Sequence, residues 1–217
     1  MNDLNKSEII LNRGWILRIQ QPRVKQNERL LVSIHGWTGD EKSTAVFHRE
    51  LPDNYWIISP RGPIKTDESG YGWIARRPGR DAALHEFIEP AAQLAEMVTR
   101  WRKDYGIEDI PLDLLGFSQG GAIAITYALT FPESVRKVAI LAGFLPEQPI
   151  GYQPGPAFSQ LHCFIAHGTH DELITIDRAH EMVERLRSFG ANIDYCQSDV
   201  GHRISASCFR KLTEFFN

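Results

Sequence analysis

Short apolar runs alternate with amphipathic stretches along most of the chain. The runs predicted to be strands are GWILRIQ (14–20), LLVSIHG (30–36), YWIISP (55–60), LDLLGF (112–117), VRKVAILAG (135–143), HCFIAHG (162–168) and ANIDYCQ (191–197). Several of them are continuously apolar rather than alternating, which is typical of parallel strands buried on both faces. The pattern therefore predicts a mostly parallel sheet.

The stretches between these runs have helical spacing, and they cover residues 82–103, 119–130, 175–189 and 205–216. In the first of them, apolar side chains recur every three or four residues and form a stripe suited to packing on a sheet. Pro90 lies inside that stretch and predicts a kink or a restart, and Gly190 is placed to cap the third helix. Strand and helix alternation of this kind predicts an α/β fold with helices on both faces of the sheet.

Two segments, 61–81 and 145–160, interrupt this alternation with glycine, proline and polar residues. Loops this long inside a domain usually have a function or lack structure. The first begins where a predicted strand ends, so it should lie at the carboxyl edge of the sheet, where open α/β sheets place their ligands. Its Tyr71 and Trp73 either anchor the loop or form a wall of the substrate cleft. Three arginines follow, Arg76, Arg77 and Arg80. They either lie in a solvated turn or favour the binding of anionic substrates.

The length of 217 residues suits one domain over 1–217, and no linker or repeat is visible. The net charge of −3 gives no electrostatic case for nucleic acid or an anionic membrane as a partner. The start of the chain lacks the layout of a signal peptide. The longest uncharged run, 114–132, contains glycines and polar residues, which favours strand–turn–helix over a membrane span. We therefore expect a cytoplasmic protein.

The three cysteines, Cys163, Cys196 and Cys208, are odd in number and widely spaced. Such spacing does not suggest a disulfide framework or a zinc site. The expectation is three reduced, mostly buried thiols and no metal.

Gly116-Phe117-Ser118-Gln119-Gly120 fits the pattern G-x-S-x-G where a predicted strand ends and a helix begins. A sharp turn there would raise the Ser118 hydroxyl above the sheet edge, and the glycines would leave room for the bend. The N-terminus of the following helix favours developing negative charge at the same place. Ser118 is therefore a candidate nucleophile.

A serine nucleophile needs a base and an acid that orients the base. Asp171 and His202 follow Ser118 in the order Ser, Asp, His, each in a loop after a predicted strand. The other acids considered are Glu172, Asp177 and Asp199. Four further histidines near strand ends are expected to brace loops: His35, His162, His167 and His170.

The oxyanion of an acyl-transfer intermediate needs two N–H donors. The backbone N–H of Gln119 would supply one, and the loop 33–41, with Trp37, the other. An ordinary glycine turn is the alternative for that loop. The side chains expected to bind the substrate are Tyr71, Trp73, Phe117 and Leu173.

Five segments together, HGWTGDE, SPRGP…GYGW, GFSQGG, HGTHDELI and GHRIS, resemble the phospholipase/carboxylesterase group of α/β-hydrolases, which includes the acyl-protein thioesterases. The resemblance runs from about residue 30 to the C-terminus. It implies an esterase or thioesterase that acts through Ser118, Asp171 and His202, with Trp37 and Gln119 at the oxyanion hole and no metal or organic cofactor. Trp37 departs from the small or aliphatic residue common at its position, so its indole is expected to reshape the acyl pocket.

The sequence thus predicts an α/β-hydrolase fold without a large cap domain. It predicts a serine carboxylesterase or thioesterase that works through an acyl-enzyme. The alternatives are a serine peptidase or amidase on the same fold and a non-catalytic protein that binds a small ligand. The expected partner is a small-molecule ester or thioester substrate, with no nucleic acid and no stable membrane insertion, and a homodimer is left open.

Overall fold

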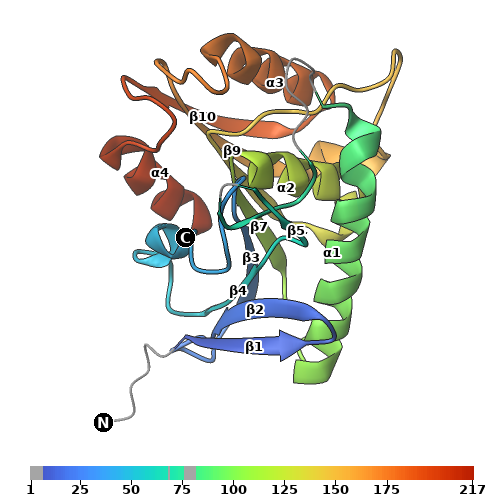
Figure 1. Ribbon diagram of the computed structural model, residues 1–217, viewed down its shortest axis with the longest axis vertical. Helices are drawn as coiled ribbons and strands as arrows, with labels where there is room; N and C mark the ends of the chain where they lie inside the picture. Colours follow the sequence, from blue (N-terminus) through green and yellow to red (C-terminus); the bar gives the residue numbers. More distant parts are fainter. Residues whose placement is uncertain (1–6, 68, 76–81) are drawn as a thin grey trace.

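The computed structural model describes residues 7–67, 69–75 and 82–217, and within them the chain builds one eight-stranded sheet (Figure 1). The strand order is β1-β2-β4-β3-β7-β8-β9-β10. The strands are β1 Glu8–Asn12, β2 Trp15–Gln20, β3 Arg29–Ile34, β4 Tyr55–Pro60, β7 Leu112–Phe117, β8 Lys137–Leu141, β9 His162–Gly168 and β10 Asn192–Ser198. A separate two-stranded hairpin pairs β5 Ile64–Lys65 with β6 Tyr71–Gly72.

Every neighbouring pair from β4 to β10 is parallel, whereas β1–β2 and β2–β4 are antiparallel. The parallel strands β3, β4 and β7 are buried over nearly their whole length, which is why they read as continuous apolar runs. Strand β1 was not predicted. It is a partly exposed edge strand, held by its hairpin with β2 through the turn Arg13-Gly14, in which both residues have positive φ.

Helices cover both faces of this sheet, as predicted (Figure 1). The α-helices are α1 Leu84–Tyr105, α2 Gln119–Thr130, α3 Ile176–Ser188 and α4 Ala206–Phe216, and the short 3₁₀ turns are η1 Ala45–His48, η2 Pro132–Ser134 and η3 Pro156–Gln160. The first three α-helices contribute to the apolar cluster on one face, and α4 packs into the cluster on the other. Among the helices of the described ranges, none is both long and apolar enough to cross a membrane.

Helix α1 runs without interruption through Pro90, so the expected restart does not occur. Pro90 lies in the second turn, where its missing N–H removes a single helical hydrogen bond. The buried stripe of the helix offsets that loss, because Phe87, Leu94 and Trp101 are completely buried against the sheet. Ile88, an apolar residue of the same stretch, is 41% exposed and lies outside the stripe.

Cys196 of β10 and Cys208 of α4 form a disulfide, which corrects the expectation of three reduced thiols. The strand and the helix pack side by side, and this brings two Cα atoms that are 12 residues apart in the chain to 5.7 Å. Cys163 remains a free thiol inside the core, and burial raises its pKa to about 12.

Two buried histidines hold the C-terminal end of β3 and the loop after it. His48 of η1 shares a hydrogen bond of 2.8 Å between its Nε2 and the Ser33 hydroxyl. His35 accepts a hydrogen bond from the Gly62 N–H on Nε2, 2.8 Å long. Burial lowers the pKa of both rings, to about 3 for His48, where the charge of Arg18 adds to the effect.

We expect the Cys208→Ser protein to have a free energy of unfolding about 3 kcal/mol lower than that of the wild type, because the disulfide restricts the unfolded chain. Urea denaturation without reductant measures the difference. Dithiothreitol should destabilise the wild type to a similar extent and leave Cys208→Ser unchanged. Thiol titration of the denatured, unreduced wild type should find one thiol, and three would contradict the pairing.

We expect the stability of the protein to fall as the pH drops below about 6.5, the pKa of histidine in an unfolded chain. Since the folded-state pKa values of His35 and His48 are lowered, their contribution is complete above that pH and is lost as the pH falls toward the folded values. For His48 the loss between pH 6.5 and pH 5 is about 2 kcal/mol.

Urea denaturation at pH 7.5 and pH 5 measures this loss. The His48→Gln protein should lose about 2 kcal/mol less than the wild type between the two pH values. The exposed His85 on α1 provides the matched control, and His85→Gln should keep the wild-type loss. An equal loss in all three proteins would contradict the assignment.

Candidate active site

Ser118 lies between β7 and α2 in a backbone conformation that residues other than glycine rarely adopt, with φ of 54° and ψ of −121°. Two hydrogen bonds fix it there: its N–H donates to the Leu141 carbonyl over 2.9 Å, and its carbonyl accepts from the Gly121 N–H over 2.9 Å. Such strain is retained only where the surroundings impose it, and it gathers at functional sites. The turn is therefore a candidate nucleophile elbow.

The two glycines of the pattern stand where backbones meet without room for a side chain. A Cβ on Gly116 would lie 2.1 Å from the Gly120 carbonyl oxygen. A Cβ on Gly120 would lie 2.2 Å from the carbonyl oxygen of Ile34 at the end of β3. Both contacts exclude any side chain, which is the physical reason for the spacing of G-x-S-x-G here.

The loop after β3 packs directly against Ser118. A Cβ on Gly36 would lie 3.1 Å from Ser118 Cβ, which places the backbone of Gly36 and Trp37 beside the candidate nucleophile. The indole of Trp37 packs against Gly72 of β6, where an added Cβ would be 2.2 Å from Trp37 Cε3. The bulky side chain at this position is thus packed against the hairpin.

Gln119 is the first residue of α2, so its backbone N–H has no acceptor within the helix. Its side chain has a second task that sequence reasoning missed. The amide oxygen accepts from the Trp73 N–H over 2.8 Å, and the amide nitrogen donates to the Ile74 carbonyl over 3.0 Å. Gln119 thus joins the elbow to the segment after β6.

Asp171 and His202 are brought together at the carboxyl end of the sheet. The buried carboxylate of Asp171 accepts hydrogen bonds on Oδ1 from the backbone N–H groups of Leu173 and Ile174, at 2.9 and 3.0 Å. Its Oδ2 accepts from His202 Nδ1 over 2.7 Å. The ring of His202 then lies 5.1 Å, centroid to centroid, from that of Phe117, the residue before Ser118.

The other acids that the sequence offered lie elsewhere. Asp199 pairs with His170 on the surface, Asp177 lies in the first turn of α3, and Glu172 is exposed. His167 braces the Asp171 loop, because its Nε2 donates to the Ile174 carbonyl over 2.8 Å. Burial lowers the pKa of His167.

Trp73 is 1% exposed and belongs to the main apolar core. Its Nε1 donates to the His35 carbonyl over 2.8 Å, and its ring packs near that of Trp15. A side chain so enclosed has no surface for a substrate, so we replace the predicted substrate contact with an anchoring role. The arginines Arg76, Arg77 and Arg80 lie outside the described residues.

Tyr71 is held by an ion pair that sequence reasoning also missed. Arg61 forms a two-pronged bond with the buried carboxylate of Glu41, at 2.7 and 2.9 Å, and its guanidinium lies 4.6 Å from the centre of the Tyr71 ring. The one signal in the sequence is that the two opposite charges sit in the segments TGDE and SPRGP. Tyr71, Phe117 and Leu173 remain at least partly accessible, with Leu173 at 66%.

The site therefore combines a hydroxyl on a strained turn, an imidazole oriented by a buried carboxylate, and the backbone N–H of Gln119, which has no acceptor within its helix. Such a set is suited to attack on a carbonyl and to stabilisation of the oxyanion that results. Among residues 7–67, 69–75 and 82–217, no three His, Cys, Asp or Glu side chains are grouped to hold a metal.

Comparison with known proteins gives both distant and local similarities. A carboxylesterase from Mesorhizobium loti superimposes with a TM-score of 0.83 at 20% identity, over 96% of this chain and 97% of its own. Pyrrolizixenacetamide deacetylase from Xenorhabdus hominickii is 28% identical over 120 residues, 55% of this chain and 40% of its own length. Acyl-protein thioesterase 1 from Mycosarcoma maydis is 34% identical over 90 residues, 40% of this chain and 38% of its own length.

The alignments thus span less than half the length of these two curated relatives. At 20% identity the solved structure shows a shared fold. The family assignment rests on a broader match, because the sequence profile of the phospholipase/carboxylesterase family covers residues 16–217. The chain belongs to the phospholipase/carboxylesterase family of α/β-hydrolases.

Proposed function

We propose that this protein is a serine esterase or thioesterase whose nucleophile is Ser118, whose base is His202 and whose orienting acid is Asp171. The observation that carries the proposal is the 2.7 Å hydrogen bond between the buried Asp171 and His202, whose ring packs near Phe117, the residue before the strained Ser118. Family membership supports a hydrolase of this class. The order of the three residues along the chain is the one used by α/β-hydrolases.

The proposed mechanism starts from the orientation of His202. Because Asp171 accepts from Nδ1, Nε2 keeps its lone pair and takes the proton of the Ser118 hydroxyl as that oxygen attacks the acyl carbonyl. The backbone N–H groups of Trp37 and Gln119 stabilise the oxyanion. His202 then protonates the leaving group, and water activated by the same ring hydrolyses the acyl-enzyme.

The substrate contacts are proposed from what surrounds this centre. Phe117 directly precedes Ser118 in the chain, and Leu173 follows Asp171 by two residues. The exposed Leu173 offers an apolar surface near Asp171. Tyr71 is fixed by Arg61 in the hairpin segment that Trp37 covers. We propose that Tyr71, Phe117 and Leu173 contact the acyl or leaving group.

Hydrolysis of an amide is a second candidate, and one observation favours it. A relative that is 28% identical over 55% of this chain is a pyrrolizixenacetamide deacetylase. The same nucleophile, base and oxyanion donors serve ester and amide cleavage. Rates on p-nitrophenyl acetate and p-nitroacetanilide compare the two activities on one acyl group, and a higher kcat/KM for the anilide would favour the deacetylase.

We expect Ser118→Ala to fold normally and to lose p-nitrophenyl ester hydrolysis by about 10⁶-fold in kcat, because the nucleophile is removed. A fluorophosphonate probe should label the wild type and leave the variant unlabelled. Asp171→Asn should lower kcat by about 10⁴-fold through loss of the oriented imidazole. A rate above a few per cent of the wild type in Ser118→Ala would contradict the assignment.

We expect Gln119→Leu to lower the free energy of unfolding by about 1–3 kcal/mol, because the variant leaves the buried backbone N–H of Trp73 without an acceptor. The backbone N–H at position 119, the proposed oxyanion donor, remains in the variant. We therefore expect KM to rise by a larger factor than kcat falls. Urea denaturation and ester kinetics measure the two effects. Gln93→Leu on the exposed face of α1 is the matched control and should change neither the free energy of unfolding nor the kinetics. Equal effects in both variants would contradict a specific role for the hydrogen bonds between Gln119 and residues 73–74.

A further inference from the structure

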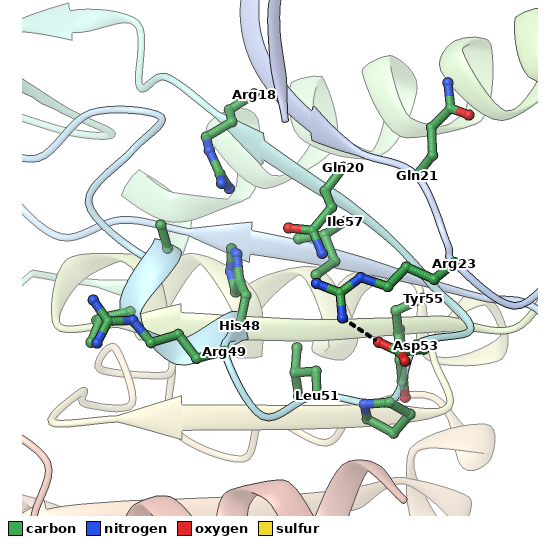
Figure 2. Close-up of a pocket in the computed structure, with 13 residues that line it drawn as sticks. Arg18, Gln20, Gln21, Arg23, His48, Arg49, Leu51, Asp53, Tyr55 and Ile57 are labelled. Atoms are coloured by element: carbon green, nitrogen blue, oxygen red, sulfur yellow. Dashed lines mark hydrogen bonds and ion pairs between the residues drawn. The ribbon is translucent and has the colours of Figure 1, made fainter. Parts of the chain in front are cut away.

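A cavity of about 370 Å³ lies apart from the candidate triad, between β2, β4 and the turn η1 (Figure 2). No residue of the candidate triad or of the oxyanion loop around Trp37 lines it. The lining is Arg18, Gln20, Gln21, Arg23, Ala45, Val46, His48, Arg49, Leu51, Pro52, Asp53, Tyr55 and Ile57. Its volume falls in the range of pockets that hold small molecules.

Within the described part of the chain, two residues of the lining, Arg18 and His48, carry hydrogen-bonding atoms without partners, and two residues next to lining residues in the ladder or the chain, Ser59 and Thr44, do as well. Among the described residues, Arg18 Nη1 and His48 Nδ1 are buried and make no hydrogen bond. Figure 2 shows Arg18 and His48 pointing toward one another. The hydroxyl of Ser59, the residue that faces Arg18 across the β2–β4 ladder, is also buried without a partner, as is that of Thr44 before η1.

Buried polar atoms in a native protein are nearly always paired, so a group of them in one place indicates a missing partner. Water can satisfy these hydrogen bonds, whereas an anion would also place a negative charge beside the partly buried Arg18 guanidinium. Burial already lowers the pKa of Arg18, which reflects the cost of desolvating the guanidinium. An anion between Arg18 and His48 would supply both the missing hydrogen-bond acceptor and the compensating negative charge.

The charges around the cavity indicate what kind of anion fits. Three arginines line it, Arg18, Arg23 and Arg49, against one carboxylate, Asp53, which pairs with Arg23 at 3.0 Å. His48, whose pKa is lowered to about 3, is neutral at physiological pH. The surplus of two positive charges matches a phosphate monoester, which carries about two negative charges at pH 7. Guanidinium groups also suit phosphate geometry.

We propose that this cavity binds a small soluble phosphate monoester, with Arg18 and His48 as donors to the phosphate oxygens and Arg49 as a further charge at the cavity. Ser33 can donate its hydroxyl proton to His48 Nε2 across their 2.8 Å hydrogen bond, which leaves Nδ1–H free to donate to the anion. The cavity is larger than one phosphate group needs, so the ester's organic part fits beside Gln20 and Gln21. This binding site is independent of the proposed hydrolysis at Ser118.

The test is equilibrium binding of glycerol 3-phosphate and inorganic phosphate, with glycerol as the neutral comparison, by calorimetry and by the shift of Tm. We expect both anions to bind and raise Tm, the ester more than inorganic phosphate, and glycerol to do neither. Arg18→Gln should raise Kd for glycerol 3-phosphate at least tenfold. Since ligand binding to the folded state stabilises it, the Tm shift should shrink in parallel.

Arg49→Gln tests the same site at an exposed residue whose replacement leaves the fold intact, and it should raise Kd at least threefold. The matched control is Arg100→Gln, which removes one exposed charge from α1 on the opposite face of the sheet and should change Kd less than twofold. An equal loss in all three variants would reveal only non-specific charge attraction. No binding by the wild type would mean that water fills the cavity. Either result overturns the proposal.

Discussion

The close backbone contact of β3, β7 and α2 around the Ser118 turn is the constraint on which the candidate site depends. Gly120 brings the first turn of α2 against the carbonyl of Ile34, and Gly116 brings β7 against the same turn. Because no side chain separates these backbones, the loop after β3 is held beside Ser118. The placement of the proposed oxyanion donors, the backbone N–H groups of Trp37 and Gln119, thus follows from two glycines rather than from the side chains at those positions.

Side chains inside this framework act mainly on the backbones of loops. His35 links its own loop to Gly62, Trp73 returns to the His35 carbonyl, and Gln119 holds the segment 73–74. Each bond joins a side chain to a main-chain group in a separate loop. The segments that meet at the site are therefore fixed to one another as well as to the sheet.

Much of the fold could be predicted from the sequence, because parallel strands and their helices leave periodic patterns. The candidate site could also be predicted, from the motif G-x-S-x-G and from the order of Asp171 and His202. Each of these residues follows a predicted strand, so its position along the chain indicates its place at the edge of the sheet. Strand β1, the disulfide and the pair of Glu41 with Arg61 were missed, and the sequence left open whether Trp73 anchors its loop or faces the substrate. These features depend on side-chain contacts between separate elements or on partial exposure, which periodicity does not report.

The disulfide makes a closed covalent ring of residues 196 to 208, and His202 lies inside that ring. A protease that cuts one peptide bond between the two cysteines would open the ring without dividing the molecule. Helix α4 would stay attached to β10 through sulfur, and its apolar face would remain packed on the sheet. The nicked protein would keep the mass of an intact chain, apart from one water, until a reductant released the C-terminal fragment.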